Sequence, residues 1–488
     1  MVNFKDYTKQ YINGKWLEGS GANTIDVLNP YDDSRLYTVK TVNEADIDQA
    51  MLTAEKAQKK WAKTTPGERK EVLSKVIAYL EEHKEEIIDI YTSETGGTIL
   101  AANIALQITF EELEEAIKFA DEVNVVNQVP ATIEGKENHV YRVPVGVITS
   151  ISPFNFPLNL SVRTIAPAIA LGNAVVHKPD VATGITGGVI LTKAFEEAGL
   201  PAGVLNLLLT DPKTDGTGDY LLEHPIPRFI SFTGSTAVGR HVGEIAGRNL
   251  KKVALELGGN NPFIVLSDAD VDRAVDAAIF GKFVHQGQIC MITNRIIVHK
   301  DIAEEFTNKF VDRAKALPYG NPKDPATVVG PLINDRQLQK AQAVIEAAIA
   351  NGEKIALEGQ RVGNILTPYV FKDVKNDSAL AQTEVFSPIA TIIPVESDEE
   401  AIRIASETEY GLSSSIFTQD LEKAQQYALQ IDSGVTHIND QTVNAQPDIP
   451  FGGNKASGVG RFGNPWLIEE FTTTKWVSVQ KTNREFPF

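Results

Sequence analysis

Cysteine is nearly absent from this sequence, which has a single one, Cys290, among 488 residues. One thiol cannot form a disulfide within the chain, and a zinc site built from several cysteines is excluded as well. The eight histidines include no pair at the His-x-x-x-His spacing that places two metal ligands on one face of a helix. We therefore expect no bound metal.

Long hydrophobic runs and clustered positive charge are also missing. Residues 1–14 contain charges and aromatics where a signal peptide needs a continuous apolar segment, so we expect a cytoplasmic protein. The most apolar stretch, 165–176, is interrupted by Pro167 and Gly172 and is too short to cross a bilayer. The formal net charge of −18 argues against a surface for nucleic acid. Neither a membrane nor a nucleic-acid partner is expected.

The chain is too long for one hydrophobic core, which predicts two or three domains. From residue 146 onward, short apolar segments alternate with amphipathic ones, a pattern typical of a parallel, doubly wound α/β sheet. A second alternating pattern after residue 257 predicts a second α/β domain.

The amino-terminal region has a different pattern. Residues 8–40 alternate short β-rich runs with turn signals and predict a strand meander. Three helices are expected over 44–62, 66–93 and 101–123, each with one buried face. We interpret the charged residues of these helices as solvated surface rather than as parts of a site.

Cys290 is the last residue of the segment Gln-Gly-Gln-Ile-Cys, and other segments of the sequence suggest that it has a catalytic role. By residue type alone, a lone cysteine is more often a small buried hydrophobe than a nucleophile. However, Glu256 ends one apolar run, Asn155 follows another, and Glu384 lies in an apolar setting. A nucleophile, a candidate base, an amide donor and a second acid are the groups that acyl-enzyme chemistry requires.

Further motifs appear in the chain in a specific order. They are His177-Lys178-Pro179, Phe232-Thr233-Gly234-Ser235 and Pro450-Phe451-Gly452-Gly453. Together with the segments around Asn155, Glu256, Cys290 and Glu384, they give a sequence that resembles the aldehyde dehydrogenase superfamily over nearly its whole length. The segment Gln-Gly-Gln-Ile-Cys most resembles the matching segment of members that oxidise aromatic aldehydes such as benzaldehyde or vanillin.

The resemblance implies an NAD(P)-dependent oxidation of an aldehyde to a carboxylic acid through a thiohemiacetal and a thioester of Cys290. It implies that Glu256 is the base for hydrolysis and that the side chain of Asn155 and the N–H of Cys290 bind the oxyanion. The cofactor-binding residues implied are Ile151, Ser152, Pro153, Phe154, Lys178, Gly234, Ser235, Leu257, Glu384 and Phe386. The residues expected to line the substrate tunnel are Phe154, Phe156, Leu160, Arg163, Ile289 and Phe451.

Two positions leave alternatives open. Arg163 is unusual in apolar surroundings; it could contact a polar substituent of the substrate, but we favour a salt bridge. Val181 stands where many NAD-preferring relatives carry a glutamate that would repel a 2'-phosphate, although the neighbouring Asp180 could partly replace it. We therefore predict that both NAD and NADP are used.

The resemblance also implies a division into domains. The NAD(P)-binding domain is expected over 1–122 and 145–256, and the catalytic domain over 257–456. A bridging arm is expected over 123–144 and 469–488, which on residue patterns alone could be an ordinary hairpin. Because such an arm supports oligomers, we expect a homodimer or homotetramer.

Other functions remain open at this point. An aliphatic aldehyde or semialdehyde dehydrogenase would use the same machinery. A non-catalytic binding member of the family would have no reason to keep Cys290, Glu256 and Asn155 together. A cysteine hydrolase would need a histidine beside Cys290, for which only the nearby His285 is available.

Overall fold

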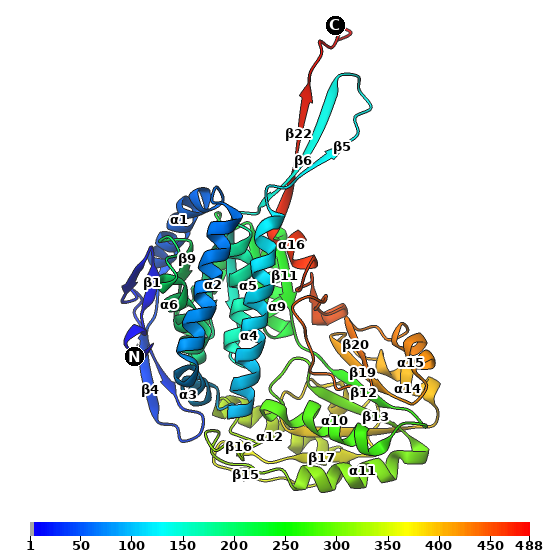
Figure 1. Ribbon diagram of the computed structural model, residues 1–488. Helices are drawn as coiled ribbons and strands as arrows, with labels where there is room; N and C mark the ends of the chain where they lie inside the picture. The colour runs from blue at the N-terminus through cyan, green and yellow to red at the C-terminus, as the bar shows by residue number, and fades with distance from the viewer. Residues whose placement is uncertain (1–3) are drawn as a thin grey trace.

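Two mainly parallel β-sheets form the frame of the computed structural model, which describes residues 4–488. Helices cover the sheets, and a narrow β arm projects from the body, with the carboxyl terminus at its tip (Figure 1). The α/β fold expected from the alternating pattern is confirmed. Within residues 4–488, no helix is long and apolar enough to span a bilayer.

The first sheet has eight strands in the order β2-β1-β9-β8-β7-β10-β11-β21, and β21 (Gly458–Val459) is an antiparallel edge strand beside β11. Its parallel strands are β7 (Val147–Ser152), β8 (Ala174–Pro179), β9 (Leu205–Leu207), β10 (Phe229–Thr233) and β11 (Lys252–Glu256). The chain runs from β7 outward to β9 and then returns to place β10 on the other side of β7. The strand order therefore reverses between β7 and β10, and ligands of such sheets bind at the carboxyl ends of the strands at this point.

Alternate residues of the strands face opposite helix layers. Val147 and Val176 pack against α1 (Glu44–Trp61), whereas Ile148 and Val175 belong to the larger core formed with α5 (Pro157–Ala170). That core also includes residues of α2 (Pro66–Glu82), α4 (Ile99–Phe119) and α6 (Ile190–Glu197). The sheet is thus buried on both faces, as its continuous apolar strands require.

The amino-terminal region differs from the prediction in two respects. The expected helix over 66–93 is two helices, α2 and α3 (Lys84–Thr95), because His83 leaves the helical conformation at φ −104° and ψ 12°. The expected single meander is wrong as well: β1 (Gln10–Ile12) and β2 (Lys15–Leu17) join the first sheet, whereas β3 (Thr24–Leu28) and β4 (Arg35–Lys40) form a separate hairpin.

The second sheet has the order β14-β17-β18-β13-β12-β19-β20. Its members are β12 (Asn261–Val265), β13 (Thr293–His299), β14 (Lys354–Leu357), β17 (Tyr369–Lys372), β18 (Ile389–Val395), β19 (Ser413–Phe417) and β20 (Val435–Ile438). The helices α10 (Val271–Phe283), α11 (Lys300–Lys315), α12 (Asp335–Ala350) and α14 (Asp398–Ala405) connect these strands. The predicted second α/β unit is therefore present, although the central strands β12 and β19 were not anticipated.

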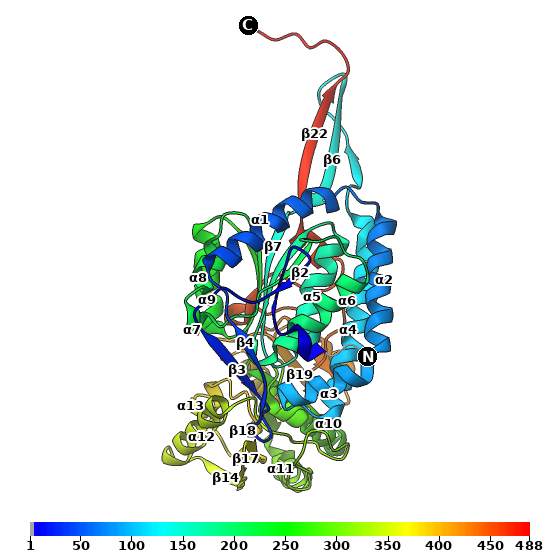
Figure 2. The same cartoon turned by 90° about the vertical axis from the view of Figure 1, so that its left-hand side faces the viewer.

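The arm is a three-stranded antiparallel sheet that stands clear of the body in both views (Figures 1 and 2). It contains β5 (Val126–Val129), β6 (Lys136–Pro144) and β22 (Thr472–Gln480). β22 pairs with β6 from Thr472 opposite Pro144 to Gln480 opposite Lys136. Segments more than 300 residues apart in the chain are thus joined in one small sheet.

Candidate active site

The loop that carries Cys290 has an unusual backbone. His285, Gln286 and Gly287 all have positive φ values, of 51°, 56° and 77°. Residues other than glycine rarely adopt this conformation, so the surrounding contacts must hold it. One such contact is the hydrogen bond of 3.0 Å that Nε2 of Gln286 donates to the carbonyl of Gly96.

The second sheet fixes the backbone of Cys290 itself. Nδ2 of Asn261, at the start of β12, donates to the carbonyl oxygens of Cys290 at 2.9 Å and Ile292 at 2.8 Å. Gly259 lies so close that a Cβ there would be only 2.3 Å from the carbonyl oxygen of Cys290. The close approach explains why glycine, not a larger residue, stands at this position.

Burial raises the pKa of the Cys290 thiol well above its ordinary value. The negative charge of Glu256 raises the pKa further, whereas the positive charge of Arg163 lowers it. Because the thiolate is the nucleophilic form, this cysteine would have to lose its proton before it could act as a nucleophile.

Glu256 is fully buried at the carboxyl end of β11. Its Oε2 forms a salt bridge with Nη2 of Arg163 at 3.2 Å, and the same nitrogen donates to the hydroxyl of Thr233 at 3.0 Å. The guanidinium also lies over the rings of Phe451 and Phe462, at 5.4 and 4.3 Å from their centres. The salt bridge favoured for Arg163 is therefore present, with Glu256 as its partner.

Asn155 is also buried, beside the loop that carries Cys290. Its Nδ2 donates to the carbonyl of Gln288 at 2.9 Å. An amide nitrogen carries two N–H groups, so one remains for another acceptor. The carbonyl of Asn155 accepts a hydrogen bond of 3.3 Å from the hydroxyl of Tyr91, which fixes the backbone at this point.

Cys290, Asn155 and Leu160 lie where two cavities meet, because all three line both. One cavity is a cleft at the carboxyl ends of the strands of the first sheet. The predicted cofactor residues in its wall are Pro153, Phe154, Gly234, Ser235, Leu257, Glu384 and Phe386. The rings of Phe154 and Phe386 meet edge to face, with their centres 6.1 Å apart.

Glu384 approaches the cleft from the second sheet. Its Oε1 accepts a hydrogen bond of 3.0 Å from the N–H of Gly259, and burial raises its pKa to about 7. Gly258 leaves room for this side chain, since a Cβ there would lie 2.3 Å from Oε2 of Glu384.

Three predicted cofactor residues do not line this cleft. The hydroxyl of Ser152 instead shares a hydrogen bond of 2.7 Å with Ser161 on α5. Ile151 lies next to Lys178 across β7 and β8, and Lys178 is buried. Burial lowers the pKa of Lys178, although the negative charges of Asp180 and of two further aspartates act to raise it.

The cleft fits a dinucleotide. Helix α9 (Thr236–Arg248) begins here after Ser235, and no side chain caps its first turn. Its leading N–H groups and the positive end of its dipole are therefore available to a pyrophosphate.

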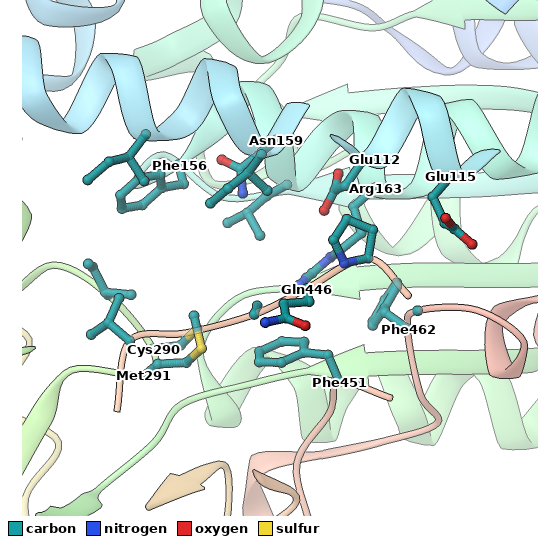
Figure 3. Close-up of a pocket in the computed structure, with 18 of the residues that line it drawn as sticks. Glu112, Glu115, Phe156, Asn159, Arg163, Cys290, Met291, Gln446, Phe451 and Phe462 are labelled. Carbon is teal, nitrogen blue, oxygen red and sulfur yellow. The ribbon is translucent and has the colours of Figure 1, made fainter. Parts of the chain in front are cut away.

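The second cavity is a mostly apolar tunnel (Figure 3). The predicted substrate residues Phe156, Leu160, Arg163, Ile289 and Phe451 all line it. Phe154, which was expected in this tunnel as well as in the cofactor site, lines only the cleft. It is the first residue of Phe154-Asn155-Phe156, and the chain turns so that its ring faces Phe386 rather than the tunnel.

The sequence did not identify the wall that α4 contributes. Ile104, Ile108, Glu112, Glu115 and Phe119 recur at helical spacing and line the tunnel (Figure 3). The prediction that the charges of this helix are solvated is wrong for Glu112 and Glu115. Their position on the otherwise apolar face of the helix is the sequence signal that could have revealed them.

The hydrolase alternative requires a histidine that can take a proton from Cys290. His285 is buried with its ring against Phe156, with centres 4.9 Å apart, and burial lowers its pKa to about 4. Neither ring nitrogen has a side-chain hydrogen-bond partner in the described chain. His285 therefore packs within an aromatic cluster and is not paired with the thiol.

Comparisons with known proteins agree on one family. The model described as "Aldehyde dehydrogenase family" matches residues 16–477. AldY of Bacillus subtilis (strain 168) is 62% identical over 487 residues, which cover 100% of both chains. A vanillin dehydrogenase of Corynebacterium glutamicum is 46% identical over 479 residues, which cover 98% of each.

A solved structure agrees as well. The crystal structure of an NAD-dependent benzaldehyde dehydrogenase from Corynebacterium glutamicum is similar with a TM-score of 0.90 at 42% identity, covering 100% of this chain and 99% of that one. The family predicted from the sequence motifs is thus confirmed, and the chain belongs to the aldehyde dehydrogenase family.

Proposed function

We propose that this protein oxidises an aromatic aldehyde to its carboxylic acid with NAD⁺ or NADP⁺. The observation that carries the proposal is the position of Cys290, where an apolar tunnel meets a cleft suited to a dinucleotide. An aldehyde entering through the tunnel and a cofactor in the cleft would both reach the sulfur.

In the first step, the thiol of Cys290 gives up its proton to water, and Sγ attacks the aldehyde carbon. The aldehyde oxygen becomes an alkoxide, and the remaining N–H of Asn155 together with the backbone N–H of Cys290 would bind it. Losing one such donor typically costs about a hundredfold in rate.

The bound cofactor would supply the hydride acceptor that converts the thiohemiacetal into a thioester. Glu256 would then deprotonate the water that hydrolyses the thioester, releasing the acid and the free thiol. A buried carboxylate paired with one arginine is held in place for this task, as a general base must be.

Several groups would hold the cofactor. The start of α9 would bind the pyrophosphate, Glu384 the nicotinamide ribose and Lys178 the adenosine ribose. Phe154 and Phe386 would frame the cleft at its Cys290 end. Position 181, a valine, adds no carboxylate to repel a 2'-phosphate, which supports use of both cofactors.

Two observations support an aromatic substrate: the aromatic side chains that line the tunnel and the names of the relatives. Phe156, Phe451 and Phe462 contribute flat walls that suit a ring. The relatives named above as benzaldehyde and vanillin dehydrogenases bear names that point to the same class. An aliphatic aldehyde or a semialdehyde is the second candidate, because the chemistry at Cys290 would be identical.

The arm supports assembly into a homodimer or homotetramer in the cytoplasm. Trp476, Val477 and Val479 of β22 are exposed, as are Val126 and Val129 of β5 at the other edge. Exposed apolar edge strands favour pairing with another copy of the chain.

A panel of aromatic and aliphatic aldehydes with each cofactor tests the proposal. We expect absorbance of reduced cofactor to rise fastest with aromatic aldehydes. Cys290→Ala should abolish turnover while cofactor binding, measured by fluorescence, is retained. Faster turnover of aliphatic aldehydes would favour the second candidate, and no reduction with any aldehyde would refute the dehydrogenase function.

A further inference from the structure

A group of polar side chains interrupts the apolar wall of the tunnel. Glu112 from α4 and Asn159 and Arg163 from α5 line the cavity (Figure 3). Figure 3 shows them on the side of the tunnel opposite Cys290 and Met291. The group therefore faces the space that a substrate bound to Cys290 would fill.

Each of these three side chains has a buried polar atom without a partner. Oε2 of Glu112, Oδ1 of Asn159 and Nε of Arg163 make no hydrogen bond within the described chain. Buried polar groups in native proteins nearly always have partners, and leaving one unpaired costs free energy. Three such atoms on one cavity wall indicate that a bound molecule pairs with them.

The three atoms have a definite chemistry. Nε of Arg163 is a donor and Oδ1 of Asn159 is an acceptor, and the carboxyl of Glu112 offers an acceptor oxygen whether or not it is protonated. Arg163 already balances the charge of Glu256, and its charge also acts on Glu112. A neutral group that both accepts and donates matches this set, and a hydroxyl is the smallest such group.

We propose that Glu112, Asn159 and Arg163 form a polar subsite that binds a hydroxyl substituent on the ring of the aldehyde. This inference rests on the proposed function and narrows its substrate class from aromatic to hydroxylated aromatic aldehydes. The ring hydroxyl accepts a hydrogen bond from Arg163 and donates one to Glu112 or Asn159. An unsubstituted ring leaves all three groups unpaired.

Glu112 is the best position for a test, because Arg163 also holds Glu256. Glu112→Leu removes the acceptor, whereas Glu112→Gln keeps an acceptor oxygen of similar reach. Glu115→Leu is a matched control on the same helix and tunnel, because both oxygens of Glu115 already have partners in Asn464 and Lys118. Asn159→Leu provides a second variant should Glu112→Leu fail to fold.

The measured quantity is the ratio of kcat/KM between the best of the three hydroxybenzaldehyde isomers and benzaldehyde. We expect the wild-type ratio to exceed one and to fall about tenfold in at least one of Glu112→Leu and Asn159→Leu, according to which acceptor the hydroxyl uses; this is the typical effect of one lost hydrogen bond of this kind. The ratio should stay near wild type in Glu112→Gln and Glu115→Leu. A wild-type ratio of one or less, or an unchanged ratio in both leucine variants at 112 and 159, would overturn the inference.

A binding experiment separates this inference from the proposed function. The Cys290→Ala protein is titrated calorimetrically with hydroxybenzyl alcohols and with benzyl alcohol, which require no reaction. Tighter binding of a hydroxylated alcohol, lost with Glu112→Leu, supports the subsite even if no aldehyde is oxidised. Oxidation of benzaldehydes together with equal binding of all the alcohols would support the dehydrogenase and refute the subsite.

Discussion

Nη2 of Arg163 lies 3.2 Å from Oε2 of Glu256, and the two side chains form a buried ion pair beside Cys290. Arg163 comes from α5 and Glu256 from the end of β11, so the pair joins a helix to a strand of the sheet on which the helix packs. Phe451 and Phe462 enclose the guanidinium. The arginine therefore acts as a positioning residue that sets where the carboxylate points.

Arg163→Met should destabilise the protein strongly. It leaves the charge of Glu256 buried without a partner, which typically costs about 3–5 kcal/mol. Thermal unfolding should show a large fall in midpoint, and Arg163→Met combined with Glu256→Gln should recover much of it because neither charge remains.

An exposed ion pair provides the control for that experiment. Arg240→Met breaks a pair with Glu409 at 3.0 Å on the surface, and such pairs contribute only about 0–1 kcal/mol. Equal losses of stability in Arg163→Met and Arg240→Met would show that the buried pair contributes no more to stability than the exposed pair.

Glu256→Gln should separate the two halves of the reaction. If Glu256 activates the hydrolytic water, the variant should form a burst of reduced cofactor close to one per active site and then stall. Rapid-mixing absorbance measurements would follow both phases. Glu409→Gln, which changes an exposed glutamate, should show steady turnover, and unchanged steady turnover of Glu256→Gln would refute the assignment.

The reactivity of Cys290 should increase with pH in the free enzyme. Burial and the charge of Glu256 raise the pKa of its thiol, so the thiol form dominates at neutral pH. The rate of alkylation by iodoacetamide should rise between pH 7 and 9, and Glu256→Gln should react faster at pH 7.5 because a negative charge has been removed. Since the chain has one cysteine, loss of free thiol reports this site alone. An alkylation rate that does not change between pH 7 and 9 would mean that Cys290 is already a thiolate at pH 7, which would contradict the prediction.

The sequence singled out four residues that the structure brings together at the candidate site. Cys290, Glu256, Asn155 and Glu384 were recognised from motifs, because each stands within a short, specific run of residues. The central strand β12 was missed because Asn260, Asn261 and Pro262 give turn signals at its start. The structure tolerates this proline where the register with β13 is irregular.

Other features depend on contacts between distant segments, which no local pattern reveals. Asn261 was not suspected of holding the backbone of Cys290, since 29 residues separate them. From the sequence, Glu112 was interpreted as one charge of a solvated helix face. In the structure, α5 and the loop around Phe451 cover this side chain and enclose it in the tunnel. The position of a charge on a helix predicts its surroundings only when the packing partner is known.

Val181→Glu should make the enzyme discriminate against NADP⁺. The residue begins a short 3₁₀ turn, Val181–Thr183, which Asp180 separates from the strand that carries Lys178. A carboxylate here would repel a 2'-phosphate, and we expect kcat/KM for NADP⁺ to fall roughly tenfold while that for NAD⁺ changes little. Val181→Gln has similar size without the charge and should leave the ratio near wild type. If wild type is inactive with NADP⁺, the prediction of dual use is wrong.

Glu112→Gln should stabilise the protein at alkaline pH. Burial raises the pKa of Glu112 from its ordinary value of 4.5 to about 8, so the folded state holds a proton that the unfolded state releases. Wild-type stability therefore decreases through this group as pH rises from about 4.5 to about 8, by up to about 1.4 kcal/mol per pH unit. Glutamine carries no proton to lose, so the advantage of the variant over wild type should grow across this range and level off above it.

Urea unfolding of the two proteins at pH 6, 7, 8 and 9 measures that difference. Glu115→Gln is the matched comparison, since Glu115 lines the same tunnel but has bonded oxygens. Its difference from wild type should not grow with pH in the same way. A constant difference for Glu112→Gln would mean that Glu112 is ionised in the folded protein already at pH 6, and that the tunnel wall carries a negative charge when the substrate arrives.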